Sequence, residues 1–141
     1  ESLARMAVAA FVADKNPTLE EISDIKTAVS EAVTNAIIHG YENENKSAHK
    51  TGDLQKVRLH CSFTGKLLVI EVEDKGVGIS DVEQAMEPLF TTKPDKERSG
   101  MGFSFMEAFM DELEVESVPG EGTLVRMQKE IGYTPWISEE D

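Results

Sequence analysis

The sequence predicts an α+β fold, a two-layer α/β sandwich in which a mixed, mostly antiparallel sheet carries helices on one face. Two helical patterns open the chain, and two pairs of alternating segments follow, with a further helical pattern between the pairs. Each pair is joined by a short turn that contains glycine, so its strands are expected to pair antiparallel. A length of 141 residues fits one domain, which we place at residues 1–130, with a loose tail over 131–141.

Apolar residues recur at helical spacing in the first 40 residues. The first predicted helix covers residues 2–13, and the Asn-Pro pair at 16–17 ends it. Thr18 is the predicted N-cap of a second helix, in which Glu21 completes a capping box, and Gly40 is the expected C-terminal cap. The apolar residues of the first helix are Leu3, Met6, Ala7, Ala10 and Phe11. The buried stripe of the second is expected to contain Leu19, Ile22, Ile25, Val29, Val33 and Ile37.

Alternating apolar and polar residues predict four strands after a polar loop at residues 41–53. The first pair covers residues 57–62 and 67–73, and the second covers 113–117 and 123–129. Between the pairs, Asp81 can cap a short helix that ends at Met86, and residues 103–110 predict another helix. Residues 88–98 show little periodicity and predict a loop.

Charge and cysteine content exclude several classes of function. The formal net charge is −13, whereas contact with a nucleic-acid backbone needs a basic surface. Cys61 is the only cysteine, so an internal disulfide is impossible, and a reducing, cytoplasmic location is expected. No apolar run is long enough to span a membrane. An acidic chain suits a basic protein partner, or a site whose cation offsets nearby carboxylates.

Glu31, Asn35 and His39 lie four residues apart and therefore share one stripe of the second helix. The three side chains offer a proton acceptor, an oxygen ligand for a hard cation and a tunable donor. On its own, this pattern is more typical of a solvated helix face than of a site.

Two glycine-rich segments follow, and each has a chemical use. Asp74 ends a predicted strand and is followed by Gly76 and Gly78, so a flat ring could approach the backbone while Asp74 accepts from an exocyclic amine. The same Asp-x-Gly pattern is also common in ordinary turns. Ser99-Gly100-x-Gly102 precedes a helix and presents free backbone N–H groups, which suit phosphate. The loop at 88–98 lies between the two segments and is expected to be a lid over phosphates, although a solvated surface loop would look the same.

These three segments together resemble the ATP-binding boxes of the superfamily that includes gyrase B, heat-shock chaperones, the mismatch-repair protein MutL and histidine kinases. The amino-acid sequences of residues 30–41, 88–94 and 97–103 most closely resemble those of the anti-sigma F factors. These are a family of serine kinases and sigma-factor antagonists of spore-forming bacteria. The resemblance implies the Bergerat ATP-binding fold, ATP and Mg²⁺ as cofactors, and two protein partners. These are a sporulation sigma factor and an anti-anti-sigma factor whose serine accepts phosphate.

The resemblance also implies roles for individual residues. Glu31 would be the general base for the substrate serine, Asn35 would be the Mg²⁺ ligand, and Arg98 would stabilise charge on the γ-phosphate. Asp74 would accept from the adenine amino group, and Arg5 on the first helix would contact protein partners. The further cofactor-binding residues would be His39, Gly76, Gly78, Thr92, Lys93, Ser99, Gly100, Met101 and Gly102.

The chain departs from the family in a polar insertion at residues 42–53 and in opening without the short N-terminal strand that borders the family's dimer interface. A homodimer is still expected, with no membrane and no direct nucleic-acid contact. Other functions stay open: a stress-response anti-sigma kinase of the same family, an ATP-hydrolysing member of the superfamily, or a module that only senses nucleotide. Without the resemblance, Arg5 would be interpreted as a solvated helix residue.

Overall fold

The computed structural model describes residues 1–41, 56–86 and 102–132, and their elements follow the predicted order. The helices are α1 (Ser2–Val12), α2 (Leu19–Asn35), α3 (Val82–Ala85) and α4 (Gly102–Phe109), with the short helical turns η1 (Ala13–Lys15) and η2 (Ala36–Tyr41). The strands are β1 (Val57–Thr64), β2 (Leu67–Asp74), β3 (Glu112–Val118) and β4 (Gly122–Glu130). The predicted polar loop beyond Tyr41 and the predicted lid at 88–98 lie outside the described residues.

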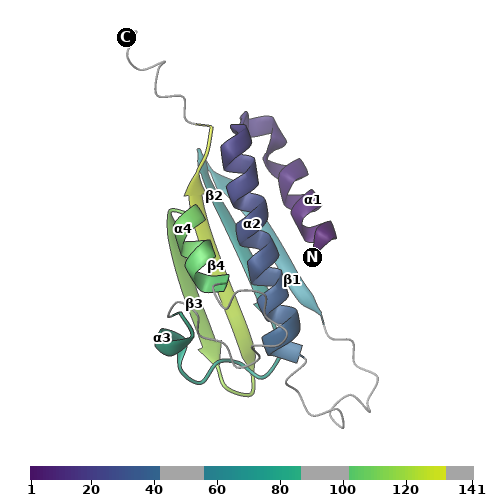
Figure 1. The fold of residues 1–141 in the computed structure, drawn as a ribbon. Coiled ribbons are helices and arrows are strands. Elements are labelled where there is room, and N and C mark those ends of the chain that lie inside the picture. The colour runs from purple at the N-terminus through teal and green to yellow at the C-terminus, as the bar shows by residue number, and fades with distance from the viewer. Residues whose placement is uncertain (42–55, 87–101, 133–141) are drawn as a thin grey trace.

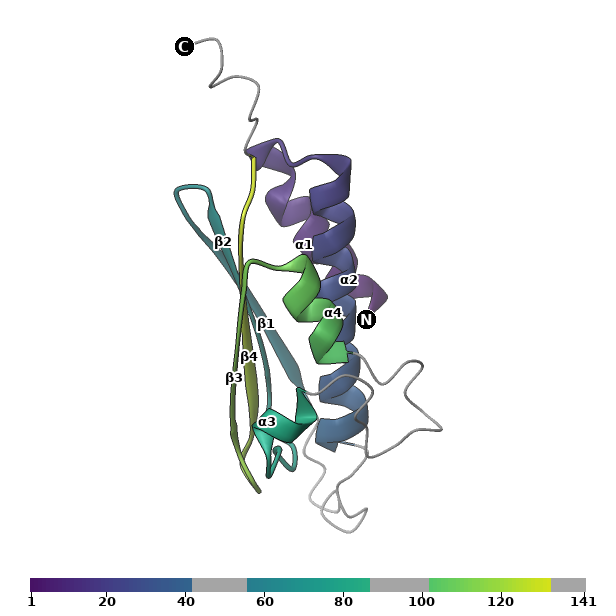
Figure 2. The ribbon, with the colours of Figure 1, turned by 60° about the vertical axis from the view of Figure 1, so that its left-hand side comes forward.

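The four described strands form one antiparallel sheet in the order β1-β2-β4-β3. Each predicted hairpin is present, and β2 and β4 pair at the centre of the sheet, where Asp74 lies opposite Thr123. Seen nearly edge-on in Figure 2, the sheet has α1, α2 and α4 on the same side. Figure 1 shows α2 running along the middle of the sheet, with α1 on one flank and α4 on the other. The predicted fold class is confirmed.

The start of α2 follows the prediction, but its end does not. The backbone N–H of Glu21 donates to Thr18 Oγ1 at 3.0 Å, and the backbone N–H of Thr18 donates to Glu21 Oε1 at 2.8 Å. Gly40 was expected to terminate the helix, and this prediction was wrong. The α-helix ends at Asn35, and a π-helical turn continues to Tyr41. Such turns widen the helix by one residue and often occur at functional sites, and sequence spacing does not reveal them.

The core lies between the sheet and the helices. Its fully buried side chains come from every layer and include Val8, Val12, Ile25, Val29, Leu68, Ile70, Met106 and Met127. The predicted apolar residues of α1 were wrong: Leu3, Met6 and Phe11 are 80%, 69% and 43% exposed, and the helix instead turns Val8 and Val12 toward the core. The predicted stripe of α2 was partly wrong, since Leu19 is 86% exposed and Ile37 is 42% exposed at the two ends of the stripe. Ile131 was placed in the loose tail, yet it is buried and its N–H donates to the carbonyl of Lys66 at 3.0 Å.

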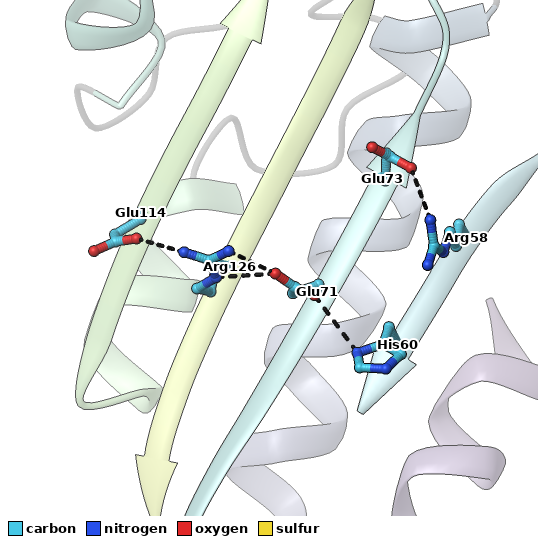
Figure 3. Close-up of polar contacts among 6 residues, drawn as sticks. All are labelled: Arg58, His60, Glu71, Glu73, Glu114 and Arg126. Carbon is cyan, nitrogen blue, oxygen red and sulfur yellow. Dashed lines mark hydrogen bonds and ion pairs between the residues drawn. The ribbon is translucent and has the colours of Figure 1, made fainter. Parts of the chain in front are cut away.

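The opposite face of the sheet carries charged side chains (Figure 3). Arg126 on β4 donates to Glu71 on β2 from Nε at 3.0 Å and from Nη2 at 2.8 Å, and its Nη1 donates to Glu114 on β3 at 3.3 Å. The hydrogen bonds to Glu71 and the charge of that carboxylate raise the pKa of Arg126 above its ordinary value. Alternation of apolar and charged residues along the strands therefore separates a buried face from a polar one, as the sequence predicted.

Candidate nucleotide site

Several predicted site residues meet at one end of the sheet. Glu31 and Asn35 lie in the last two turns of α2, Asp74 ends β2, and Gly102 begins α4. In the chain Asp74 follows Asn35 by 39 residues and Gly102 follows Asp74 by 28, so only the fold brings these segments together.

The end of α2 touches the start of α4. A Cβ atom placed on Gly102 would lie 2.8 Å from Nδ2 and 3.2 Å from Oδ1 of Asn35, so only glycine leaves room for that amide. Asn35 is half-buried, and so is Glu31 one helical turn earlier. The amide oxygen is thus held beside the N-terminal end of α4, where the helix dipole favours negative charge. The start of α4 therefore suits a phosphate group, and an amide oxygen beside such a group is a ligand of the kind that Mg²⁺ takes.

Asp74 is buried, with 6% of its surface exposed, and shapes the glycine loop that follows it. Its Oδ1 accepts a hydrogen bond from the backbone N–H of Gly76 at 2.9 Å. Gly78 has φ = +76°, and a Cβ there would collide with the carbonyl oxygen of Val118. Gly78 is therefore required by the backbone, both by its positive φ and by the close approach of the loop to β3.

Two hydroxyl residues that sequence reasoning missed complete this end of the sheet. The backbone N–H of Ile79 donates to Ser117 Oγ at 2.6 Å, Ser117 Oγ donates to the carbonyl of Gly122 at 3.0 Å, and Ser117 Oγ lies 2.8 Å from Thr123 Oγ1. Asp74, Thr123 and Ser117 are neighbours across β2, β4 and β3. A signal was available, because Ser117 and Thr123 are polar residues at strand positions where the alternation expects buried apolar ones.

The described residues hold only part of the predicted site. His39 lies in η2, but its side chain is not described. The remaining predicted phosphate and lid residues fall outside the described ranges: Thr92, Lys93, Arg98, Ser99, Gly100 and Met101.

Arg5 on α1 lies near Glu31 on α2. Both side chains line one open groove of about 420 Å³ between α1 and α2. The Nε–H of Arg5 is buried and has no hydrogen-bond acceptor among the described residues. Its Nη2 donates to Ser2 Oγ over a long 3.4 Å. Glu31 therefore lies one helical turn before Asn35 and also lines a groove on the protein surface.

The described residues contain no cluster of three or more His, Cys, Asp or Glu side chains that could hold a metal ion by themselves. A single amide ligand still suits Mg²⁺, which usually binds through one or two protein oxygens together with substrate phosphates. Within the same residues, no helix is both long enough and apolar enough to cross a membrane.

Comparison with known proteins gives first the class and then the family. Residues 1–129 match the model of the histidine kinase-like ATPase domain, and this class of domain binds ATP. A protein from a Thermoanaerobacter species named anti-sigma F factor is 58% identical over 94% of this chain and 86% of its own length. Proteins of the same name from Caldanaerobacter subterraneus and Clostridium beijerinckii are 58% and 55% identical over 94% and 93% of this chain, each over 86% of its own length. The chain therefore belongs to the anti-sigma F factor family of histidine kinase-like ATPase domains.

Proposed function

We propose that this protein is an anti-sigma factor and an ATP-dependent protein serine kinase. It binds and inhibits a sporulation sigma factor, and it phosphorylates a serine of an anti-anti-sigma partner with Mg²⁺-ATP. The observation that supports this proposal best is the position of Glu31, which lies one helical turn before Asn35 and also lines the groove that contains Arg5. A carboxylate that serves only to activate water for ATP hydrolysis would not need an open protein-facing groove.

In the proposed reaction, different residues bind the adenine base, hold the metal ion and accept the proton. Asp74 accepts from the adenine amino group, and the glycine loop and Thr123 form the surroundings of the base. Asn35 is the protein ligand of Mg²⁺, which neutralises phosphate charge when it is bound. Glu31 takes the proton of the substrate hydroxyl as the serine oxygen bonds to the γ-phosphorus, and the bond from that phosphorus to the β–γ bridging oxygen breaks to release ADP. Of the residues outside the described ranges, Arg98 is proposed to stabilise the developing charge, and Thr92, Lys93, Ser99, Gly100 and Met101 to hold phosphates or close over them.

The test is incubation with labelled ATP, Mg²⁺ and the anti-anti-sigma protein of the same organism, followed by identification of the phosphorylated residue. Glu31→Gln should bind ATP and partner normally but transfer phosphate about 10²–10⁴-fold more slowly, which is the usual contribution of a general base. Transfer near the wild-type rate would contradict the role of Glu31. Absence of transfer by the wild-type protein would contradict kinase activity itself. The expected homodimer and the cytoplasmic location stay predictions.

A further inference from the structure

We propose that the groove between α1 and α2 binds the phosphoacceptor segment of the partner protein, and that Lys26 and Arg5 together hold an acidic side chain of that segment. This inference rests on the proposed kinase function and adds to it a recognition element, with Lys26 as a residue that determines specificity. It follows from the lining of the groove, from its charge and from its position relative to Glu31.

The side chains that line the groove change along α2 from apolar to polar and then to acidic. Leu19 and Ile22 line it near the start of the helix, the hydroxyl residues Thr27 and Ser30 further along, and Glu31 near its end. α1 lies beside α2, and the start of α1 meets the later turns of α2, where Glu1 Oε2 accepts hydrogen bonds from Ser30 Oγ and Thr34 Oγ1, both at 2.7 Å. Since the end of α1 leads through η1 to the start of α2, the two helices are antiparallel. Arg5, one turn after Glu1, is therefore level with the middle of the groove, where Lys26 also lies.

The charge of the groove is opposite to that of the chain. The chain has a net charge of −13, yet the lining carries two cations, Arg5 and Lys26, against one carboxylate, Glu31. Lys26 is half-buried and has no ion-pair partner among the described residues. Arg5 also forms no ion pair with them, and its Nε lacks an acceptor. Two cations without carboxylate partners, in a chain with 27 acidic residues, fit an acidic segment supplied by another molecule.

The spacing on α2 sets the position of that acidic residue. Lys26 precedes Glu31 by five positions, which is roughly 7–8 Å along the helix axis. An extended peptide advances roughly 3.3 Å per residue. When the acceptor serine of the partner lies beside Glu31, the partner residue that reaches Lys26 is therefore two or three positions away from that serine, and this is where we expect its acidic side chain. An apolar residue of the partner still further from the serine would reach Leu19 and Ile22.

The first experiment measures phosphoryl transfer to the anti-anti-sigma protein with Lys26→Glu. We expect the KM for the acceptor to rise about tenfold or more, the scale of one lost charge contact in an interface, with kcat and the Kd for ADP unchanged. Lys26→Arg should retain most of the affinity. Arg58→Glu is the matched control, because Arg58 lies on the opposite face of the sheet with its side chain 73% exposed, and the variant changes the net charge equally. Equal effects of Lys26→Glu and Arg58→Glu would overturn the proposal.

The second experiment uses short synthetic serine peptides that carry one glutamate at different distances from the serine. Wild-type protein should phosphorylate best the peptides with glutamate two or three residues away. Lys26→Glu should instead prefer peptides with lysine at that same distance. A rate that does not depend on the position of the glutamate would overturn the proposal.

Direct binding separates this inference from the proposed kinase activity. If the wild-type protein transfers no phosphate, calorimetric titration of the anti-anti-sigma protein into wild type and Lys26→Glu still tests the groove, and equal affinities would contradict it. If Lys26→Glu weakens sigma-factor binding alone and leaves the acceptor affinity unchanged, the groove belongs to the sigma factor and the assignment to the phosphoacceptor is wrong.

Discussion

The side-chain amide of Asn35 lies against the α-carbon of Gly102, so the end of α2 and the start of α4 meet where no further methyl group fits. Nδ2 of Asn35 would be 2.8 Å from a Cβ atom on Gly102. This contact joins two segments that sequence analysis interpreted separately, one as a metal ligand and the other as part of a phosphate loop. Because of this contact, a substitution at Gly102 can displace the Asn35 amide while Asn35 itself is unchanged.

Gly102→Ala should weaken Mg²⁺-ATP binding about tenfold or more, because the added methyl group pushes the Asn35 amide away from its position. Stability should change little, since the obstructing atoms are the end of a side chain that can rotate, and alanine is the better helix former. Calorimetry and thermal unfolding measure the two effects. Gly65→Ala is the control: Gly65 has φ = +61° and no atoms near its Cβ direction, so the variant should lose about 1 kcal/mol of stability and keep its ATP affinity. Unchanged ATP affinity in Gly102→Ala would contradict the proposed role of the contact.

Asn35→Ala should abolish the part of ATP affinity that depends on Mg²⁺. The amide oxygen is a neutral hard ligand, and its loss leaves the charge of the triphosphate poorly bridged. The measurement is the Kd for ATP with Mg²⁺ and again with a chelator. We expect the variant to give the same value in both conditions and the wild type to differ. A variant that still responds to Mg²⁺ would show that the ion is held by other groups.

Asp74→Asn should remove the preference for adenine while leaving the glycine loop in place. The variant keeps an Oδ1 acceptor for the Gly76 N–H but replaces the second carboxylate oxygen by a donor. Loss of a hydrogen bond to a charged group corresponds to a decrease in ADP affinity of about 10–100-fold. Titration with ADP and with inosine diphosphate, which lacks the amino group, tests this directly. Equal losses for both nucleotides would indicate that Asp74 acts only on the loop.

Ser117→Ala should destabilise the protein by about 1–3 kcal/mol, because the N–H of Ile79 loses its acceptor in a partly buried place. ADP affinity should fall as well, since the loop after Asp74 loses its tie to β3. Denaturant unfolding and calorimetry measure the two quantities. Ser62→Ala, on the uncovered face of β1, is the control and should change neither. A stability loss with unchanged ADP affinity would limit Ser117 to a structural role.

The thiol of Cys61 should react slowly with alkylating reagents. Cys61 is half-buried on the helix-facing side of β1 and packs against the core, and this burial raises the pKa of its thiol. A raised pKa lowers the thiolate fraction near pH 8, and the thiolate is the reactive form. The modification rate at pH 8 should be lower than that of a free cysteine and should increase on unfolding. A rate as fast as that of the free amino acid would contradict this prediction.

The sequence predicted the elements well because their signals are local. Hairpin turns, alternation and the capping box of Thr18 each depend on a few adjacent residues, and all were confirmed. The π-helical turn at Ala36–Tyr41 was not predictable, since it arises where α2 meets the sheet and α4. The exposure of Leu19 was missed for a related reason: helical periodicity identifies an apolar stripe but not how far the sheet extends beneath it.

Individual residues of the candidate site could be predicted from the sequence, but the contacts between them could not. Spacing identified Asn35 and Gly102, and only the packing of α2 against α4 revealed that they touch. Ser117 and Thr123 were missed because a hydroxyl in a strand has no motif of its own. The partner of Ser117, Ile79, lies 38 residues away in the chain.

The hydrogen bond from Ile79 to Ser117 also decides how the edge strand aligns with its neighbour. On the charged face, β3 carries Glu112, Glu114 and Glu116 in alternation, so a two-residue slip along β4 would still place a glutamate opposite Arg126. The ion pair therefore tolerates such a slip. On the helix-facing side, the slip that brings Glu112 opposite Arg126 would place Val115 opposite Thr123, and the slip in the other direction would place Pro119 there. Either slip would remove Ser117 from Thr123 and leave the Ile79 N–H without its acceptor. The hydroxyl that holds the loop after Asp74 is thus also a group that specifies the strand register, so a misaligned β3 would leave that loop without its hydrogen bond to the sheet.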